Sequence, residues 1–361
     1  MKITKTNNQK GLVSIIVTLI IMIVLTLIVT GFAQLARNEQ REATDRQLNS
    51  QALFAAQSGI NAAEAKVKAE IAAGNYGNYS DCSSFSTSGI GTNNAEPTCI
   101  LVNKTPETLV VQNVLTNKST ILPIEQGGGG TLDDLTISWE NQSHNNVVRY
   151  SALPLTNVFL RANGGTSPDS AHWGDNGVGV LRIDLVPVDS LDSNTLREGM
   201  FTAFLVPTTS NVAGVGVVDY SVGSSTNKQG VVVGAKCSGP PASKKLCAVQ
   251  ITGLNGPGRT KYYLRMKSIY NPSDVVICPS NAFNCTNGQT LVKAQTVIDV
   301  TARAADVLKR VQVRVNSDPN AAASYSFPEY TLDSAESICK LLTVTPTSTT
   351  DDSTDVTKCP A

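Results

Sequence analysis

The chain has 361 residues, of which 29 are basic and 29 acidic, so its formal net charge is zero. Charged residues make up 16% of the chain, and this low share excludes both a general basic surface for nucleic acid and a highly charged disordered protein. Apolar residues make up 41%, which is enough for a sizeable core, and the length suits two or three domains or one large β unit.

The chain begins with a short basic segment that leads into a long apolar one. Residues 1–10 contain three lysines and no acidic residue, and Gly11 follows them. From Leu12 to Ala36 there are 25 residues without a charge, and a helix of this length, about 37 Å, crosses a hydrocarbon core. The lysines predict a cytoplasmic N-terminus, so we expect a single-pass cytoplasmic membrane protein whose remaining chain is translocated.

The helical pattern continues beyond the apolar segment. Residues 37–73 contain no proline and one glycine, Gly59. An apolar stripe with alternating spacings of three and four, typical of one face of an α-helix, is formed by Leu53, Ala56, Ile60, Ala63 and Val67. We therefore expect one helix from Leu12 to about Ala72, roughly 90 Å long, whose second half is amphipathic and packs on the rest of the protein.

These features occur in the order found in type IV prepilins. A basic leader ends in Lys10-Gly11, an uncharged helix starts at once, and an amphipathic half follows. Residues 11–65 resemble the N-terminal region of PilX-like minor pilins, in which an apolar run and an Arg/Glu-rich turn precede a segment such as Phe54-Ala55-Ala56-Gln57. The resemblance covers about residues 1–70.

The resemblance implies an α+β fold, with a long N-terminal helix packed on a large antiparallel β-rich extracellular domain that contains disulfides. It also implies that a prepilin peptidase removes residues 1–11 by cleavage between Gly11 and Leu12. Residues 12–36 would then be the membrane helix and residues 37–73 its amphipathic continuation. The residues that we assign to the membrane and filament core include Ile16, Met22, Gly31 and Phe32.

Two positions depart from the family pattern. Prepilins usually begin the mature chain with Phe or Met and have Glu at its fifth position, whereas this chain has Leu12 and Ile16 there. In the family, that Glu is thought to neutralise the N-terminal amine of a neighbouring subunit. Its absence resembles tip-type minor pilins and pseudopilins. The alternative interpretation is a signal anchor that is never cleaved.

Residues 74–330 are expected to form the β-rich domain. Short segments rich in Val, Ile, Tyr and Thr alternate with turn residues, without long helical patterns between them, and this favours antiparallel sheets. Between Tyr76 and Gln126 we expect mainly turns and one strand, and near the end a meander that includes Val297–Thr301, Val311–Val315 and Tyr262–Ile269. The predicted strands are Thr108–Leu115, Leu135–Trp139, Val147–Leu153, Gly179–Val186, Gly199–Val206, Val212–Tyr220, Gly230–Gly234, Cys247–Ile251, Tyr262–Ile269, Thr290–Thr301 and Ala305–Val315.

The eight cysteines indicate an oxidising compartment. They fall into four couples that are close in sequence, and none has the C-x-x-C spacing of a zinc or redox site. Eight cysteines allow many pairings, but short loops close most easily, so local disulfides are favoured over reduced thiols. The predicted disulfides are Cys82–Cys99, Cys237–Cys247, Cys278–Cys285 and Cys339–Cys359.

Residues 331–361 are expected to form a separate C-terminal region. Tyr330–Leu342 has the pattern of a short helix, and Thr343–Thr357 is low in complexity and rich in Thr, Ser and Asp. The Cys339–Cys359 couple brackets this segment, which resembles the disulfide-delimited C-terminal region of pilins. An ordinary polar tail tethered by a disulfide is the alternative.

The sequence contains no convincing catalytic or metal-binding constellation. Gly253–Thr260 resembles a P-loop with Arg in place of Lys, but a strand-like pattern follows where a P-loop needs a helix, so we interpret it as a turn. His144 and His172 are isolated. Two polar segments contain possible Ca²⁺ ligands but lack the EF-hand spacing, and both are interpreted as solvated loops: Asp189, Asp192 and Asn194, and Asp351, Asp352 and Asp355.

We therefore expect a non-catalytic minor pilin-like subunit of a type IV pilus or related pseudopilus, without a cofactor or metal. The size of its β-rich domain and the residue at position 16 suggest a tip location, with a role in assembly, adhesion or capture of a surface or DNA. Its expected partners are other pilin subunits, prepilin peptidase and the assembly platform of the cytoplasmic membrane. The sequence does not decide whether the protein contacts nucleic acid, and it does not identify the surface ligand. The alternative is an uncleaved, membrane-anchored extracellular binding protein.

Overall fold

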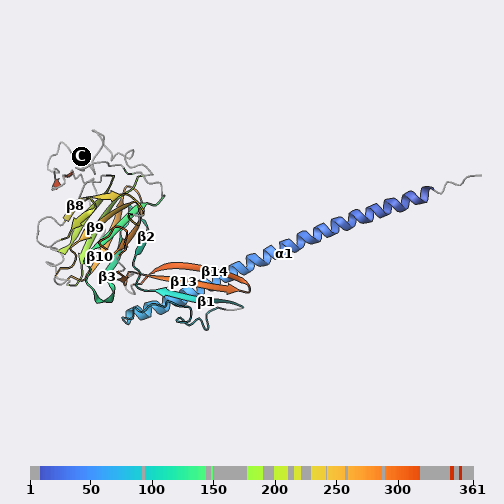
Figure 1. The fold of residues 1–361 in the computed structure, drawn as a ribbon, viewed down its shortest axis with the longest axis horizontal. Helices are drawn as coiled ribbons and strands as arrows, with labels where there is room; N and C mark the ends of the chain where they lie inside the picture. Colours follow the sequence, from blue (N-terminus) through green and yellow to red (C-terminus); the bar gives the residue numbers. More distant parts are fainter. Residues whose placement is uncertain are drawn as a thin grey trace, which may run out of the picture. The chain divides into compact units, whose positions relative to one another are not determined.

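The computed structural model describes residues 9–91, 94–143, 148, 177–189, 199–209, 215–220, 229–240, 242–256, 259–286, 289–317, 342–344 and 349–351. The chain divides into two compact units (Figure 1). The first comprises residues 1–62, 81–100 and 299–311, and the second comprises residues 63–80, 101–298 and 312–361.

The long helix α1 runs from Gln9 to Ala72. It starts three residues before the predicted position and ends where the sequence predicts. Gly74 ends it with a positive φ of 79°, donating its N–H to the carbonyl of Ile71 at 3.0 Å, while Asn75 donates to that of Glu70 at 2.8 Å. This pair of bonds is a Schellman motif, which satisfies carbonyls that the last helical turn leaves without partners.

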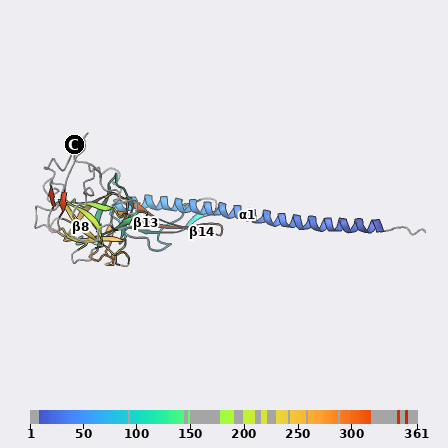
Figure 2. The same ribbon diagram turned by 90° about the horizontal axis from the view of Figure 1, so that it is seen from above.

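In the first unit, strands pack on the helix. A three-stranded sheet has the order β1-β13-β14, formed by β1 (Ala95–Asn103), β13 (Gln295–Ala304) and β14 (Val307–Asn316), and Figures 1 and 2 both show its strands beside α1. Small helix residues permit close approach: Ala52 and Ala56 are fully buried, and a Cβ on Gly59 would lie 2.9 Å from Val300 Cγ1. The Cys82–Cys99 disulfide ties the segment before β1 to that strand.

The second unit contains, among the described residues, an eleven-stranded sheet with the order β12-β3-β10-β5-β6-β8-β9-β4-β11-β2, to which β7 adds beside β9. Its strands are β2 (Leu109–Val114), β3 (Thr120–Gln126), β4 (Leu135–Asn141), β5 (Val180–Pro187), β6 (Phe201–Thr208), β7 (Val217–Asp219), β8 (Gln229–Cys237), β9 (Cys247–Thr252), β10 (Lys261–Ile269), β11 (Ser273–Cys278) and β12 (Leu291–Val292). A short 3₁₀ turn, η1 (Gly127–Gly129), follows β3.

This large sheet curls around one hydrophobic core. Ser268 in β10 donates its N–H to the carbonyl of Leu115, just after β2, at 3.1 Å, so strands near opposite ends of the sheet order meet. Alternate residues point inward, as in β10, where Tyr262, Leu264 and Met266 are buried and their neighbours are not. Trp139 is fully buried and donates its indole N–H to the carbonyl of Gly179 at 2.9 Å, which satisfies its polar atom.

The structure confirms the β-rich fold but corrects several details of the strand prediction. β1, β3 and β11 were not predicted. Two pairs, β6 with β8 and β7 with β9, are parallel, although the other pairs in the large sheet are antiparallel in the part described. Two strands of the predicted meander, β13 and β14, are neighbours in the three-stranded sheet. The inclusion of Tyr262–Ile269 is wrong, because β10 pairs with β3 and β5 in the large sheet.

The predicted strand Thr290–Thr301 is in fact two strands that belong to different sheets. Lys293 has a positive φ of 67°, which ends β12 and turns the chain into β13. β12 pairs with β3 in the large sheet, whereas β13 lies in the three-stranded one. The segment predicted as Val212–Tyr220 contains only the three residues of β7 as a strand in its described part. The segment Val147–Leu153 lies outside the described residues apart from Val148.

Three disulfides are present in the described parts of the chain, and their pairs are three of the four predicted ones. Cys237–Cys247 joins β8 to β9, and Cys278–Cys285 closes the loop after β11. Cys339 and Cys359 lie outside the described residues. Near the C-terminus, β15 (Leu342–Val344) pairs with β16 (Thr349–Asp351). Leu342 is therefore a strand residue and not the last residue of the predicted helix, whose other positions are outside the description.

Candidate functional site

The apolar part of α1 is exposed along its whole described length. The helix from Ser14 onward includes a window with a mean hydropathy of 3.0 in which no residue is buried. No charged residue occurs between Gly11 and Arg37. Its threonines satisfy their hydroxyls within the helix: Thr26 donates to the carbonyl of Met22 at 2.8 Å, and Thr30 to that of Thr26 at 2.9 Å. An uncharged helix whose threonine hydroxyls bond to its own backbone is suited to lipid or to the interior of a helical bundle.

The residues predicted for the membrane and filament core lie on this exposed segment. The relative exposures of Ile16, Met22 and Phe32 are 51%, 71% and 67%. A Cβ on Gly31 would meet no atom within 4 Å. Gly11 and Leu12, the predicted cleavage residues, lie within α1, but their side chains are outside the description. The residues predicted for the membrane and filament core therefore all lie on the exposed part of one helix.

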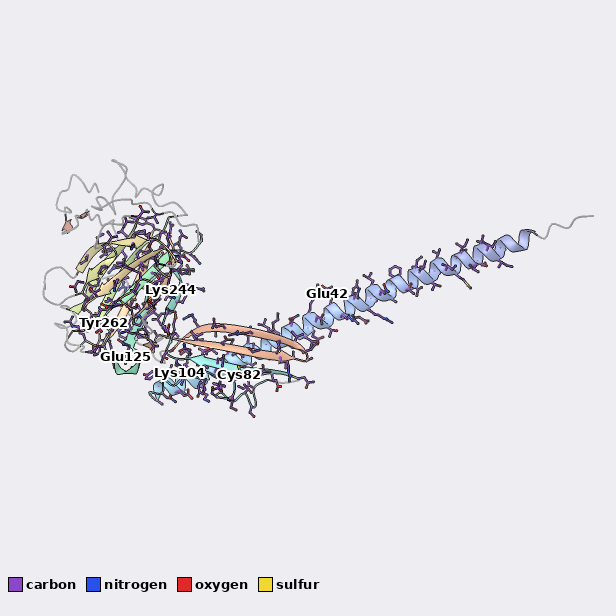
Figure 3. All side chains as sticks on the ribbon, viewed as in Figure 1. Glu42, Cys82, Lys104, Glu125, Lys244 and Tyr262 are labelled. Atoms are coloured by element: carbon purple, nitrogen blue, oxygen red, sulfur yellow. A yellow bond between two sulfur atoms is a disulfide. The ribbon has the colours of Figure 1, made fainter. Side chains whose placement is uncertain are left out.

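A charged collar follows the apolar segment. It contains three basic and three acidic residues, so its net charge is zero: Arg37, Glu39, Arg41, Glu42, Asp45 and Arg46. All are exposed, and Arg46 pairs with Glu42 at 2.5 Å (Glu42 is labelled in Figure 3). An exposed i,i+4 pair contributes only about 0.3–0.5 kcal/mol. The collar limits the apolar segment to a length that spans a membrane.

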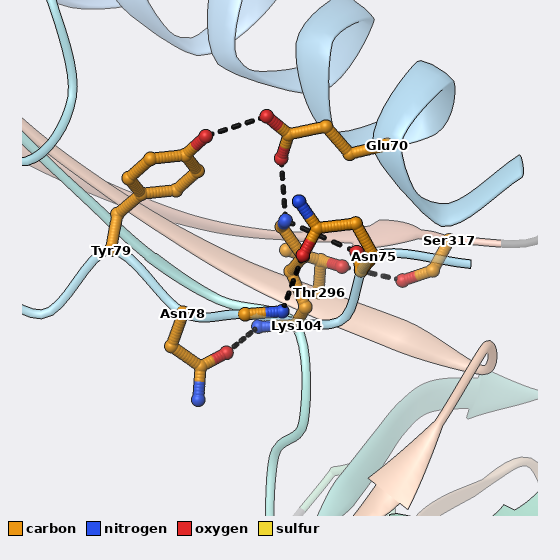
Figure 4. Close-up of polar contacts among 8 residues, drawn as sticks. Glu70, Asn75, Asn78, Tyr79, Lys104, Thr296 and Ser317 are labelled. Atoms are coloured by element: carbon orange, nitrogen blue, oxygen red, sulfur yellow. Dashed lines mark hydrogen bonds and ion pairs between the residues drawn. The ribbon is translucent and has the colours of Figure 1, made fainter. Parts of the chain in front are cut away.

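A buried lysine anchors the other end of α1. Lys104 follows β1 and is fully buried, and its Nζ donates to Glu70 Oε2 at 2.5 Å and to the carbonyl of Asn75 at 3.3 Å. The Tyr79 hydroxyl donates to the other oxygen, Glu70 Oε1, at 2.6 Å (Figure 4). Both carboxylate oxygens are therefore bonded, and a cation lies beside a carbonyl of the helix C-terminus, where the helix dipole favours positive charge.

The segment after the helix is tied to β1 by further bonds. Asn78 Oδ1 accepts the backbone N–H of Lys104 at 2.7 Å, and Tyr79 exchanges two backbone hydrogen bonds with Val102, at 2.8 and 2.9 Å. The ammonium groups of Lys66 and Lys104 lie 4.8 and 5.2 Å from the centroid of the Tyr79 ring. We call Glu70, Asn75, Asn78, Tyr79 and Lys104 the helix anchor.

The electrostatics of the helix anchor keep Glu70 ionised. Burial by itself raises the pKa of Glu70, but the hydrogen bonds from Lys104 and Tyr79 and the charge of Lys104 outweigh it, so the pKa lies below its ordinary value. Burial and the bond to Glu70 raise the pKa of Tyr79, so its hydroxyl stays a donor. Sequence reasoning missed this anchor, because nothing marks a lysine beside a turn as buried.

The predicted polar loops contain one residue with a clear structural role. Asp189 accepts hydrogen bonds from Thr260 N and Oγ1, both at 2.6 Å, and from Lys261 N at 3.0 Å. Burial by itself raises the pKa of Asp189. The hydrogen bonds and the charge of Lys261 outweigh this effect, so the pKa lies below its ordinary value. Asp189 thus fixes the turn before β10. Asp192, Asn194, His144 and His172 lie outside the described residues, as do Asp352 and Asp355, while Asp351 ends β16.

The segment that resembles a P-loop lies between two strands. The segment Gly253–Thr260 connects β9 to β10, so a strand follows it and the turn interpretation is confirmed. Within the described ranges, no group of three or more His, Cys, Asp or Glu side chains is placed to hold a metal ion. The candidate functional site of this chain is therefore the uncovered helix with its collar and its anchor.

One comparison with known proteins gives a match. Residues 10–61 match the family model described as PilX N-terminal. The matched residues contain the apolar segment, the charged collar and the small residues that pack on the three-stranded sheet. No curated protein and no solved structure matches the chain.

Proposed function

Because residues 10–61 match the family model described as PilX N-terminal, we propose that the chain is a PilX-like minor pilin of the type IV pilin family, which works without catalysis at or near a filament tip. The observation that carries the proposal is the uncovered apolar helix, whose exposed residues need either lipid or other helices around them. The family implies interaction with other pilus components, and the apolar helix implies membrane anchoring.

The proposed route begins in the cytoplasmic membrane, with the N-terminus inside and the β-rich part outside. Prepilin peptidase cleaves between Gly11 and Leu12, and the assembly platform then moves residues 12–36 from lipid into the filament core among other pilin subunits. Residues 37–73 continue this helix, residues 74–330 form the extracellular domain, and residues 331–361 form its C-terminal region. Outside the cell the domain acts in assembly, adhesion or capture of a surface or DNA.

The tip location is proposed because of Ile16. An aliphatic residue there lowers the cost of holding the helix in lipid. It also removes the carboxylate that would pair with the N-terminal amine of a neighbouring subunit. A subunit that starts a filament manages without this contact, whereas a shaft subunit needs it at every step. The large extracellular domain supports the same location, since bulk is poorly tolerated along a packed shaft.

The test compares Ile16→Glu with Ile20→Glu. Both changes place one carboxylate on the helix, at residues of similar exposure, 51% and 53%, but only the first restores the position that pairs with the amine. We expect immunogold labelling of wild-type filaments at their ends only. Ile16→Glu is expected to add labelling along the shafts, and Ile20→Glu is not. Wild-type labelling along whole shafts, or identical labelling in both variants, would refute the tip assignment.

A further inference from the structure

The turn between β9 and β10 folds an arginine back into the second unit. Arg259 donates its backbone N–H to the carbonyl of Gly256 at 3.1 Å, which closes the turn. A Cβ on Gly256 would lie 2.8 Å from Arg259 Nη2 and 2.9 Å from its Cζ. The guanidinium therefore lies close to the Gly256 backbone.

This guanidinium is buried without a counter-charge. Arg259 is 9% exposed, and its Nη1 is fully buried and has no hydrogen-bond partner among the residues that the structure describes. No ion pair joins Arg259 to a described carboxylate. Among the described residues, Tyr220 is its neighbour of another kind: the Tyr220 hydroxyl interacts with the Arg259 side chain, and the centroid of the Tyr220 ring lies 5.5 Å from Cζ. A cation–π contact of this type offsets only part of the cost of burying a charge.

The polar groups around Arg259 also have other partners. The Tyr220 hydroxyl donates to the carbonyl of Gly199, and the Tyr262 hydroxyl donates to that of Leu254. Burial raises the pKa of both tyrosines, so neither becomes a phenolate near neutral pH. Asp189, on the neighbouring turn, spends its carboxylate on the backbone and hydroxyl of Thr260 and on the Lys261 N–H.

An arginine cannot escape burial by losing its proton, because its guanidinium stays charged in proteins. Buried charges are paired, and an unpaired donor in a protein interior indicates a water or an ion. From these observations we propose that Arg259 binds a small monovalent anion through Nη1, next to the Tyr220 ring. The anion is a halide or a carboxylate, since the burial of Nη1 favours a compact ligand. The site is independent of filament assembly.

The first experiment measures thermal unfolding of the full chain in detergent, in chloride, acetate or gluconate at equal ionic strength. Gluconate serves as the bulky reference anion. We expect chloride or acetate to raise the unfolding midpoint by about 2–4 °C over gluconate; a response to chloride alone identifies a halide site, and one to acetate a carboxylate site. Arg259→Gln should abolish the difference. Lys118→Gln, which removes an exposed positive charge, should retain it. Equal midpoints in all three salts for the wild-type protein would overturn the proposal.

A second measurement does not depend on the folding of the variant. Wild-type crystals grown in bromide or soaked in it are expected to give an anomalous peak in contact with Arg259 Nη1. If chloride stabilises the protein but Arg259→Gln does not fold, this peak shows whether the halide binds at Arg259. A peak elsewhere only, with none at Arg259, would contradict the site.

Discussion

Lys104 illustrates how a single residue determines the geometry at the end of α1. Its ammonium is fully buried, and it donates both to one oxygen of Glu70 and to the carbonyl of Asn75, just beyond the end of the helix. Such a pair gives limited net stabilisation relative to apolar residues, but removal of one partner leaves the other as an uncompensated buried charge. The side chain of Lys104 is the less exposed of the two, 0% against 19% for Glu70. Loss of Glu70 is therefore the more damaging change.

We predict that Glu70→Gln lowers the free energy of unfolding by about 3 kcal/mol, because it leaves the Lys104 ammonium buried without a carboxylate. The double variant with Lys104→Met should recover a large part of this loss. Urea unfolding of the full chain in detergent measures both effects. Glu42→Gln is the matched control, since it breaks an exposed ion pair on the same helix, and its cost should stay below about 0.5 kcal/mol. Equal losses for Glu70→Gln and Glu42→Gln would contradict the role of the helix anchor.

The same carboxylate predicts a pH dependence. The ordinary pKa of Glu70 is 4.5 and its pKa in the folded protein is lower, so below pH 4.5 the unfolded chain takes up a proton that the folded chain still excludes. The stabilisation is therefore complete above that pH and is lost as the pH falls through the folded pKa. Unfolding measured as a function of pH should show a steeper acid loss for the wild-type protein than for Glu70→Gln. Parallel curves would assign the acid loss to other carboxylates.

The functional residues differ in how far the sequence predicts them. The position of Ile16 and its neighbours in an apolar helix is predicted directly from the sequence, because a long uncharged run can be recognised without knowledge of tertiary contacts. Lys104 and Arg259 are not, because lysine and arginine are rarely buried and only the folded chain brings Glu70 to the first and the Tyr220 ring to the second. Disulfides between cysteines that are close in sequence can be predicted in part, because a short loop closes more easily than a long one.

Among the elements, the contact between α1 and the three-stranded sheet depends on Gly59. A Cβ there would lie 2.9 Å from Val300 Cγ1 and 3.3 Å from Pro97 Cβ, and both of these belong to stiff side chains. Pro97 has no freedom to move away, and Val300 is branched at Cβ. The glycine is therefore required by close packing, although it weakens the helix on its own.

We predict that Gly59→Ala destabilises the protein, because an overpacking cost of about 1–3 kcal/mol exceeds the helix propensity that Ala adds, about 1 kcal/mol. Gly31→Ala, in open space on the same helix, should not destabilise. Addition of Val300→Ala to Gly59→Ala should restore part of the loss by providing room. Denaturant unfolding of the four proteins, wild type included, is the measurement; a Gly59→Ala protein as stable as Gly31→Ala would refute the close packing.

The fourth predicted disulfide, Cys339–Cys359, has a direct test. Its loop of 20 residues would contribute about 3 kcal/mol in the chain-entropy account. Non-reducing peptide mapping of the full chain should yield this pair together with the three that the structure contains. Free thiols at both positions, or a bridge from either cysteine to another couple, would discard the prediction.

Two of the strands that sequence reasoning missed, β1 and β3, contain prolines. Pro97 lies in β1 and Pro123 in β3, and a proline normally argues against a strand because it lacks the N–H that a ladder needs. Both are tolerated for a structural reason: β1 is an edge strand, and the neighbour of β3 on one side, β12, pairs only with Glu125 and Gln126. Pairings between distant strands leave no local signal. The helix was predictable because a run of 25 residues without a charge is followed by an apolar stripe with helical spacing.

At the scale of the whole molecule, the helix and the β-rich part have different requirements. The described strands bury their own core of side chains such as Trp139, Tyr262 and Phe201, whereas the apolar helix residues from Ile15 to Leu35 bury nothing within this chain. An exposed apolar element of this kind needs apolar surroundings, which in the proposed function are first lipid and then the helices of other subunits. The proposed processing step lies between these two environments.

The most direct test of this account is the N-terminus of the protein in sheared filaments, determined by mass spectrometry. We predict a chain that starts at Leu12, and we predict that Gly11→Ala leaves the chain unprocessed in the membrane while Gly31→Ala is cleaved normally. A chain that retains Met1 in cells with an active prepilin peptidase, and that is found only in the membrane fraction, would contradict the pilin assignment and favour a permanent membrane anchor.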